Sequence, residues 1–265
     1  MARTFVPASS NYLRDSSSAA LSGLAESFTV AAWYKFSAAA RQDAGVISIA
    51  DGANKRHLLY FWNEGGTTQR LAMFSGNGAT TAQATVGPIT PDTNWHLAVG
   101  IVSATNSRQA YLDTTGGTAD TTDVTGITGM SDYVIGQYFP SGSATAGFYA
   151  DGDMAEAAIW NVALTEAEIT SLYRGASPQR IRAGALVSYV PIIGRASPEP
   201  DLVSGDALAL NGTPAQAAHP RVIRLRPRIW RPNAAAASSA FNILRPGIIR
   251  PARNQNNRII SGAMQ

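Results

Sequence analysis

The chain contains no cysteine, and only 15% of its residues are charged. The lack of cysteine excludes disulfide bonds and thiolate metal sites. No apolar run approaches the roughly 20 residues that a membrane-spanning helix needs. The segment Met1–Pro7 has none of the apolar core of a secretory signal. We therefore expect synthesis in a cytoplasm, with later release by cell lysis left open. A phosphate-binding glycine loop and a Ser-His-Asp order are also missing.

The basic residues are distributed unevenly along the chain. The whole sequence has 21 basic and 18 acidic residues, but residues 221–265 contain nine arginines and no acidic residue. Removing those nine leaves 12 basic residues against 18 acidic ones, so residues 1–220 carry a formal charge of −6 and residues 221–265 one of +9. Such asymmetry indicates an acidic body with a basic interaction arm. We therefore expect a domain at 1–220 and an extended arm at 221–265.

Short stretches of alternating apolar residues recur along the body. Turn dipeptides such as Asn77-Gly78 and Asp151-Gly152 separate them. Within Phe28–Phe36, the alternation places Trp33 on the face opposite Tyr34. Evenly spaced short strands predict an all-β fold, an antiparallel β-sandwich or jelly roll. The expected strands are 28–36, 46–49, 58–62, 71–74, 95–102, 109–112, 133–135, 154–160, 186–190 and 207–210.

One short helix is expected at about 165–174. Thr165 and Glu168 form a capping box, in which each side chain can accept a hydrogen bond from the other residue's backbone N–H. Leu164 and Ile169 occupy the two positions of a hydrophobic staple. Gly175 can adopt the left-handed conformation that ends a helix.

Three stretches resemble the laminin G-like and pentraxin superfamily, which has the concanavalin A-like jelly-roll fold. The resemblance covers about residues 5–175 and is most specific in its last stretch. Its segments are Asn11–Leu13 with Ser27–Trp33, Asn94–Val99 with Gln109–Asp113, and Gly152–Ile169.

The resemblance implies a binding protein more than an enzyme. Members of the superfamily mostly bind glycans or extracellular proteins, some with calcium, and some relatives are glycosidases. Residues 186–220 are similar to segments that follow such domains in bacteriophage proteins. The fold alone does not assign a function.

Three carboxylates, Asp151, Asp153 and Glu156, are spaced like the paired acids of glycosidases in this superfamily. Retaining glycosidases need two carboxylates roughly 5 Å apart. The sequence lacks the first glutamate of that pattern, and Gly152 is typical of a turn. We therefore expect structural carboxylates and no catalytic residue.

No resident cofactor is expected, and a calcium ion is the alternative left open. Calcium takes 6–8 oxygen ligands, several of them carboxylates. In pentraxin-like domains acidic residues follow a Gly-Gln pair, but no carboxylate follows Gly136-Gln137 directly. The candidate ligands are therefore Asp51, Asp151 and Asp153. His96 is expected to pack or form hydrogen bonds rather than bind a metal.

Aromatic pairs flank the small-residue loop 141–147. Glycan-binding proteins stack sugars on such rings, so this loop is the candidate ligand surface, with Tyr138, Phe139, Phe148 and Tyr149 as its binding residues. The competing interpretation, which strand alternation favours, is that rings such as Tyr60 and Trp62 fill the core.

The arm contains one motif twice. Residues 226–232 and 245–251 both have the sequence Arg-Pro-x-Ile-x-Arg-Pro. Prolines keep the segment extended, and its apolar density exceeds what phosphate contacts need. We therefore expect docking along another protein subunit, with nucleic-acid contact or a disordered tail as alternatives. The expected docking residues are Arg226, Ile229, Trp230, Arg231, Arg245, Ile248, Ile249 and Arg250.

These features together predict a non-enzymatic structural protein of a bacteriophage virion, a capsid decoration or a fibre or spike component. The arm would anchor it, and the lectin-like domain would stabilise the particle, bind the host surface, or both. Expected partners are other virion proteins, further copies of the chain, preferably in a trimer, and a host-surface glycan, with neither nucleic acid nor membrane. The alternatives are a free-standing carbohydrate-binding module and a glycoside hydrolase or depolymerase.

Overall fold

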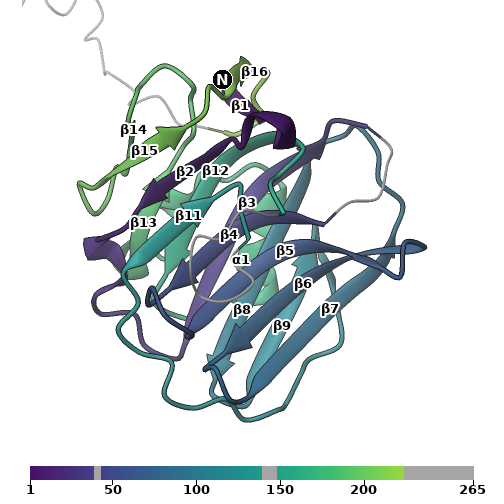
Figure 1. The fold of residues 1–265 in the computed structure, drawn as a ribbon, viewed down its shortest axis with the longest axis vertical. Coiled ribbons are helices and arrows are strands. Elements are labelled where there is room, and N and C mark those ends of the chain that lie inside the picture. Colours follow the sequence, from purple (N-terminus) through teal and green to yellow (C-terminus); the bar gives the residue numbers. More distant parts are fainter. Residues whose placement is uncertain (39–42, 139–147, 224–265) are drawn as a thin grey trace, which may run out of the picture. The chain divides into compact units, whose positions relative to one another are not determined.

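The structure is a computed structural model that describes residues 1–38, 43–138 and 148–223. Within these ranges, two antiparallel sheets pack face to face, as Figure 1 shows. The predicted all-β sandwich is confirmed. No helix in the described ranges is long and apolar enough to cross a membrane. The eight expected docking residues of the arm and Phe139 lie outside the described residues.

The two sheets are called sheet A and sheet B. Sheet A has the order β10 (Thr115–Gly116), β9 (Ser107–Leu112), β8 (His96–Ala104), β3 (Phe28–Phe36), β12 (Gly152–Trp160), β1 (Ala2–Phe5) and β16 (Ala215–Ala217), and β13 (Leu186–Val190) also pairs with β12. Sheet B has the order β14 (Glu199–Pro200), β15 (Ala207–Asn211), β2 (Tyr12–Asp15), β11 (Asp132–Ile135), β4 (Ala44–Ala50), β5 (Arg56–Glu64), β6 (Thr68–Gly76) and β7 (Thr81–Ile89).

The main core lies between the sheets and follows from strand alternation. In β3, the even-numbered residues from Phe28 to Phe36 enter this core, whereas Trp33 points to the opposite face, as predicted. Tyr34, Phe36 and Phe61 form an aromatic cluster with ring centroids 4.7–5.0 Å apart. Burial of each large apolar side chain stabilises the fold by about 1.5–3 kcal/mol.

The outer face of sheet A is covered by a second apolar layer. Helix α1 (Glu166–Tyr173) buries Ile169 and Leu172 there, and the short 3-10 helices η3 (Pro178–Arg180) and η4 (Ala183–Ala185) follow it. Trp160 packs in this layer, and its Nε1 donates a hydrogen bond to the carbonyl oxygen of Ile181 at 2.7 Å. The predicted capping box of α1 is present. Two further 3-10 helices, η1 (Pro7–Ser9) and η2 (Ala19–Leu21), lie near the start of the chain.

The last described residues remain attached to the fold. The backbone N–H of Ile223 donates to the carbonyl oxygen of Gly175 at 2.6 Å, and Ile223 forms a parallel bridge with Ala176. Gly175 has the left-handed φ of 93° that was expected after the helix. Backbone contacts therefore continue three residues past position 220.

Candidate functional site

The outer face of sheet B carries a row of aromatic side chains. In β5, Leu59 and Phe61 enter the main core, whereas Tyr60 and Trp62 join a separate cluster on the outer face. Tyr60 is 8% exposed and buried in this second apolar cluster, and Trp62 packs partly buried against it, so both rings pack against apolar side chains but neither enters the main core between the sheets. The inward positions of this strand are already filled by other apolar side chains. Trp62 is the more accessible of the two rings.

Two rings from the connection between β11 and β12, Tyr138 and Phe148, pack near this row. Tyr138 stacks on Tyr60 with the ring centroids 4.9 Å apart and the planes at 27°. Phe148 contacts Tyr138 edge-on at 5.0 Å. The carbonyl oxygen of Phe148 accepts hydrogen bonds from the N–H groups of Tyr138 and Gly45, at 3.3 and 3.0 Å. A Cβ atom at Gly45 would overlap the backbone of Gln137, so the glycine permits this close approach.

Together these side chains line a cavity of about 160 Å³, which we call the aromatic cavity. Its lining residues are Asp43, Tyr60, Trp62, Tyr138 and Phe148. One Asp43 carboxylate oxygen, Oδ1, accepts the backbone N–H of Asn63 at 2.8 Å. The Tyr60 hydroxyl donates to Oε1 of Gln83 at 2.8 Å.

Two tyrosine hydroxyls of the aromatic cavity stay protonated at neutral pH. Burial raises the pKa of Tyr60 and also that of Tyr138. The cavity thus combines the exposed Phe148 ring, the partly buried Trp62 and Tyr138 rings and the buried Tyr60 ring with neutral hydroxyls and one carboxylate. Such a set can bind a ligand that has an apolar face and hydroxyl donors.

The predicted ligand residues are only partly brought together. Tyr138 and Phe148 both line the aromatic cavity, and Phe148 is 43% exposed. Tyr149 stacks instead on Tyr12 of β2, with centroids 6.2 Å apart. The sequence did not predict Asp43 as a site residue. Its hydrogen-bond partner, Asn63, is 20 residues away in the sequence, so no local pattern indicates the contact.

The predicted calcium ligands have other partners. Oδ1 of Asp51 closes a turn by accepting the N–H groups of Ala53 and Lys55 at 2.9 and 3.0 Å. Asp153 accepts the Thr4 hydroxyl at 2.6 Å and pairs with the Lys35 ammonium at 3.2 Å.

Asp151 and Asp153 flank the start of β12 in sheet A, whereas Asp51 follows β4 in sheet B. Among the described residues, no three histidine or acidic side chains form a group that could hold a metal ion. These donors do not fit a calcium ion.

Glu156, the third carboxylate of the acidic triplet, is buried at a β-bulge. It has a left-handed φ of 57° and is 2% exposed. Its Oε2 accepts the Tyr189 hydroxyl at 2.7 Å, and its Oε1 lies 3.0 Å from Nε2 of His219. Since Asp153 is held by Lys35, these carboxylates bind neighbouring side chains of the protein.

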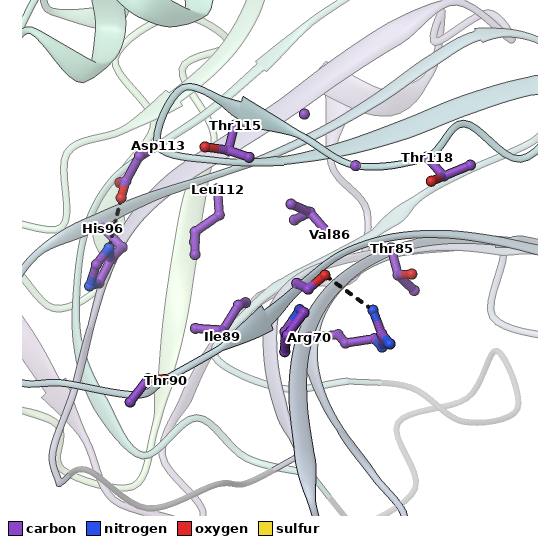
Figure 2. Close-up of a pocket in the computed structure, with 14 residues that line it drawn as sticks. Arg70, Thr85, Val86, Ile89, Thr90, His96, Leu112, Asp113, Thr115 and Thr118 are labelled. Atoms are coloured by element: carbon purple, nitrogen blue, oxygen red, sulfur yellow. Dashed lines mark hydrogen bonds and ion pairs between the residues drawn. The ribbon is translucent and has the colours of Figure 1, made fainter.

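A larger cleft of about 700 Å³ lies between β7 and the turn that joins β9 to β10. Figure 2 shows His96 with Asp113 at one end and Arg70 at the other, with Ile89 and Leu112 between them. Arg70 binds Oε2 of Glu64 at 2.7 Å and the carbonyl oxygen of Gly87 at 3.3 Å.

His96 is hydrogen-bonded, as predicted. Its Nδ1 lies 2.9 Å from Asp113 Oδ2, and its Nε2 lies 3.0 Å from Asp92 Oδ1. The hydrogen bond to Asp113 is the main cause that raises the pKa of His96 to about 9, and Asp92 adds to it. The charged groups that line the cleft thus all have partners within the protein, and its lining residues include no phenylalanine, tyrosine or tryptophan.

The fold and the aromatic face define a lectin-like β-sandwich. The chain belongs to the Laminin_G_3 family of the concanavalin A-like lectin/glucanases superfamily, whose profile matches residues 8–170. The predicted resemblance is confirmed. No curated protein matches the chain.

Solved structures show the same fold at low sequence identity. A candidate carbohydrate-binding protein from Bacteroides ovatus is 19% identical with a TM-score of 0.57, over 84% of this chain and 61% of that one. Tailspike protein 2 of the Escherichia coli O157:H7 bacteriophage CAB120 is 14% identical with a TM-score of 0.52, over 71% of this chain and 26% of that one. The SAP-like pentraxin of Limulus polyphemus is 17% identical with a TM-score of 0.48, over 62% of this chain and 75% of that one.

Proposed function

We propose that this chain is a non-enzymatic carbohydrate-binding protein and that the sugar binds in the aromatic cavity. The observation that carries the proposal is the stack of Tyr60 and Tyr138 in a cavity shared with Trp62 and Asp43. Aromatic rings offer apolar faces against which the C–H face of a sugar can pack. The Asp43 carboxylate can accept hydrogen bonds from sugar hydroxyls. The Bacteroides ovatus relative supports the same class of function.

A glycan array probed with the full chain tests this proposal. Trp62→Ala and Tyr138→Ala should each weaken binding by about tenfold or more, which corresponds to about 1.4 kcal/mol. Tyr173→Ala is the matched control, because Tyr173 is a 41% exposed ring on α1 that stacks on Trp33, away from the cavity. The proposal is wrong if no glycan binds, or if all three variants bind like the parent.

No catalytic step is part of the proposal. Asp153 and Glu156 have the protein partners described above, and the Glu156 carboxylate is buried. A hydrolase or depolymerase would release reducing ends from any glycan that the array identifies. Release that is lost in Glu156→Gln would overturn the non-enzymatic assignment.

We further propose that the protein is a structural component of a bacteriophage virion, made in the host cytoplasm. In this role it is a capsid decoration or a fibre or spike component, and residues 221–265 anchor it to other virion proteins or to further copies of itself. The repeated Arg-Pro motif supports the anchor. The likeness to a bacteriophage tailspike, although it concerns the fold alone, supports the setting. A trimer with exchanged arms is the assembly that we favour.

Deletion of residues 225–265 tests the anchor. The cut preserves the pairing of Ile223 with Gly175, so the body should stay folded and keep its glycan binding. The truncated protein should fail to join particles, and normal incorporation would contradict the anchor. Replacing Ile229, Trp230, Ile248 and Ile249 by alanine should weaken attachment more than changing the four motif arginines to glutamine. The opposite order, with a steep salt dependence, would favour nucleic acid.

A further inference from the structure

Arg56 stands out among the cations on the outer face of sheet B. It begins β5 and shares its face with Tyr60, four residues along the strand. Its guanidinium lies 5.1 Å from the centre of the Phe74 ring, and Nη1 donates to the carbonyl oxygen of Asn54 at 3.2 Å. Its Nε is buried and has no hydrogen-bond partner among the described residues. A buried donor without a partner costs free energy until a ligand or water supplies an acceptor.

Two other arginines on this side of the fold are neutralised by acids. Arg14 binds Asp132 through Nε and Nη2 at 2.8 and 2.6 Å. Arg70 binds Glu64 at 2.7 Å. Within the described ranges, no carboxylate forms an ion pair with Arg56. Its positive charge is therefore available to an anionic group from outside the chain.

Arg56 does not line the aromatic cavity but lies beside it, because Phe74, the ring under its guanidinium, packs in the same outer-face cluster as Tyr60, Trp62 and Tyr138. Burial is the main cause that raises the pKa of Tyr60 and of Tyr138, and the positive charge of Arg56 opposes both increases. Asp43 has the opposite effect on the same two hydroxyls. The cavity thus lies under the influence of a carboxylate and of an uncompensated guanidinium.

We infer that the aromatic cavity selects sugars that carry a carboxylate, with the acid group bound by Arg56. The sugar ring packs on Tyr138 and Trp62, and its hydroxyls face Asp43. Arginine suits this task because its planar fork binds a carboxylate through two parallel hydrogen bonds. The inference rests on the proposed carbohydrate binding and specifies the ligand class of the same site.

Matched pairs of sugars test the inference in the full chain. Each pair has the same linkage and differs only in a carboxylate, such as cellobiose and cellobiouronic acid, or an acidic and neutral pair chosen from the array. Titration calorimetry should give at least about tenfold tighter binding of the acidic member, which corresponds to roughly one good charge-assisted hydrogen bond.

The variant Arg56→Gln should reduce this preference to near unity and leave the neutral sugar's affinity within about twofold, because only the carboxylate contact is lost. Arg180→Gln is the control, since it removes the same charge from an exposed position on η3. Arg56→Lys keeps the charge but loses the fork, so an intermediate preference is expected. If Arg56→Gln does not fold, the Arg56→Lys variant provides the test of the carboxylate contact instead.

The outcomes separate the two proposals. Tight binding of the neutral sugar without a preference for the acidic one would overturn the inference and leave carbohydrate binding intact. A preference that survives in both Arg56 variants would also overturn it. Binding of neither sugar, with an array that shows no ligand, would overturn carbohydrate binding itself.

Discussion

The bridge around His96 predicts a specific dependence of stability on pH. His96 is held between Asp113 and Asp92, and these contacts raise its pKa from 6.5 to about 9. Because the pKa is higher in the folded state than in the unfolded state, the contribution to stability is fully present below pH 6.5. It is lost as the pH rises through about 9.

The size of the effect follows from the gap of about 2.5 pKa units. At about 1.36 kcal/mol per unit, the upper bound is roughly 3.4 kcal/mol. The His96 side chain is 18% exposed, and those of Asp113 and Asp92 are 24% and 45% exposed. Solvent screening therefore reduces the expected loss to roughly 1–2 kcal/mol.

Urea denaturation of the parent protein and of His96→Gln between pH 6 and 9.5 measures this loss. The difference in unfolding free energy between the two proteins isolates His96, because the other titrating groups are shared. That difference should fall by roughly 1–2 kcal/mol across the range. A flat difference, or one that rises with pH, would refute the assigned bridge. High salt should reduce the effect, since the acids are partly exposed.

Further predictions concern single side chains. Gly45→Ala should displace Tyr138 and weaken glycan binding by about tenfold, whereas Gly23→Ala, with open space around its Cβ, should not change binding on the same array. Thr165→Ala removes the N-cap of α1 and should lower the unfolding free energy by about 1 kcal/mol in urea titrations. Burial lowers the pKa of His57 to about 3, so stability should fall as pH drops below 6.5. The fall should be smaller in His57→Gln.

Strand β5 shows why the sequence predicted the fold better than the site. The alternation of apolar residues predicted which face of β3 enters the core, because one face of that strand is continuously apolar and the other face is less apolar. In β5, both faces are apolar, with Leu59 and Phe61 on one side and Leu58, Tyr60 and Trp62 on the other. A period of two cannot tell which apolar face is the core. The capping box of α1 was predictable because its contacts are local.

The two outer faces of the sandwich differ in how they are covered. The outer face of sheet A is buried beneath α1 and the segment that follows it, and Ile223 is tied to Gly175 at the end of that helix. The aromatic cavity lies on the outer face of sheet B, which is on the other side of the main core. The aromatic cavity, where we propose that ligand binds, and the attachment of the last described residues therefore lie on opposite faces of the sandwich. Since the described residues that line the aromatic cavity all lie before residue 221, deletion of residues 225–265 should leave glycan binding unchanged, and anchoring and glycan binding should be separable by mutation.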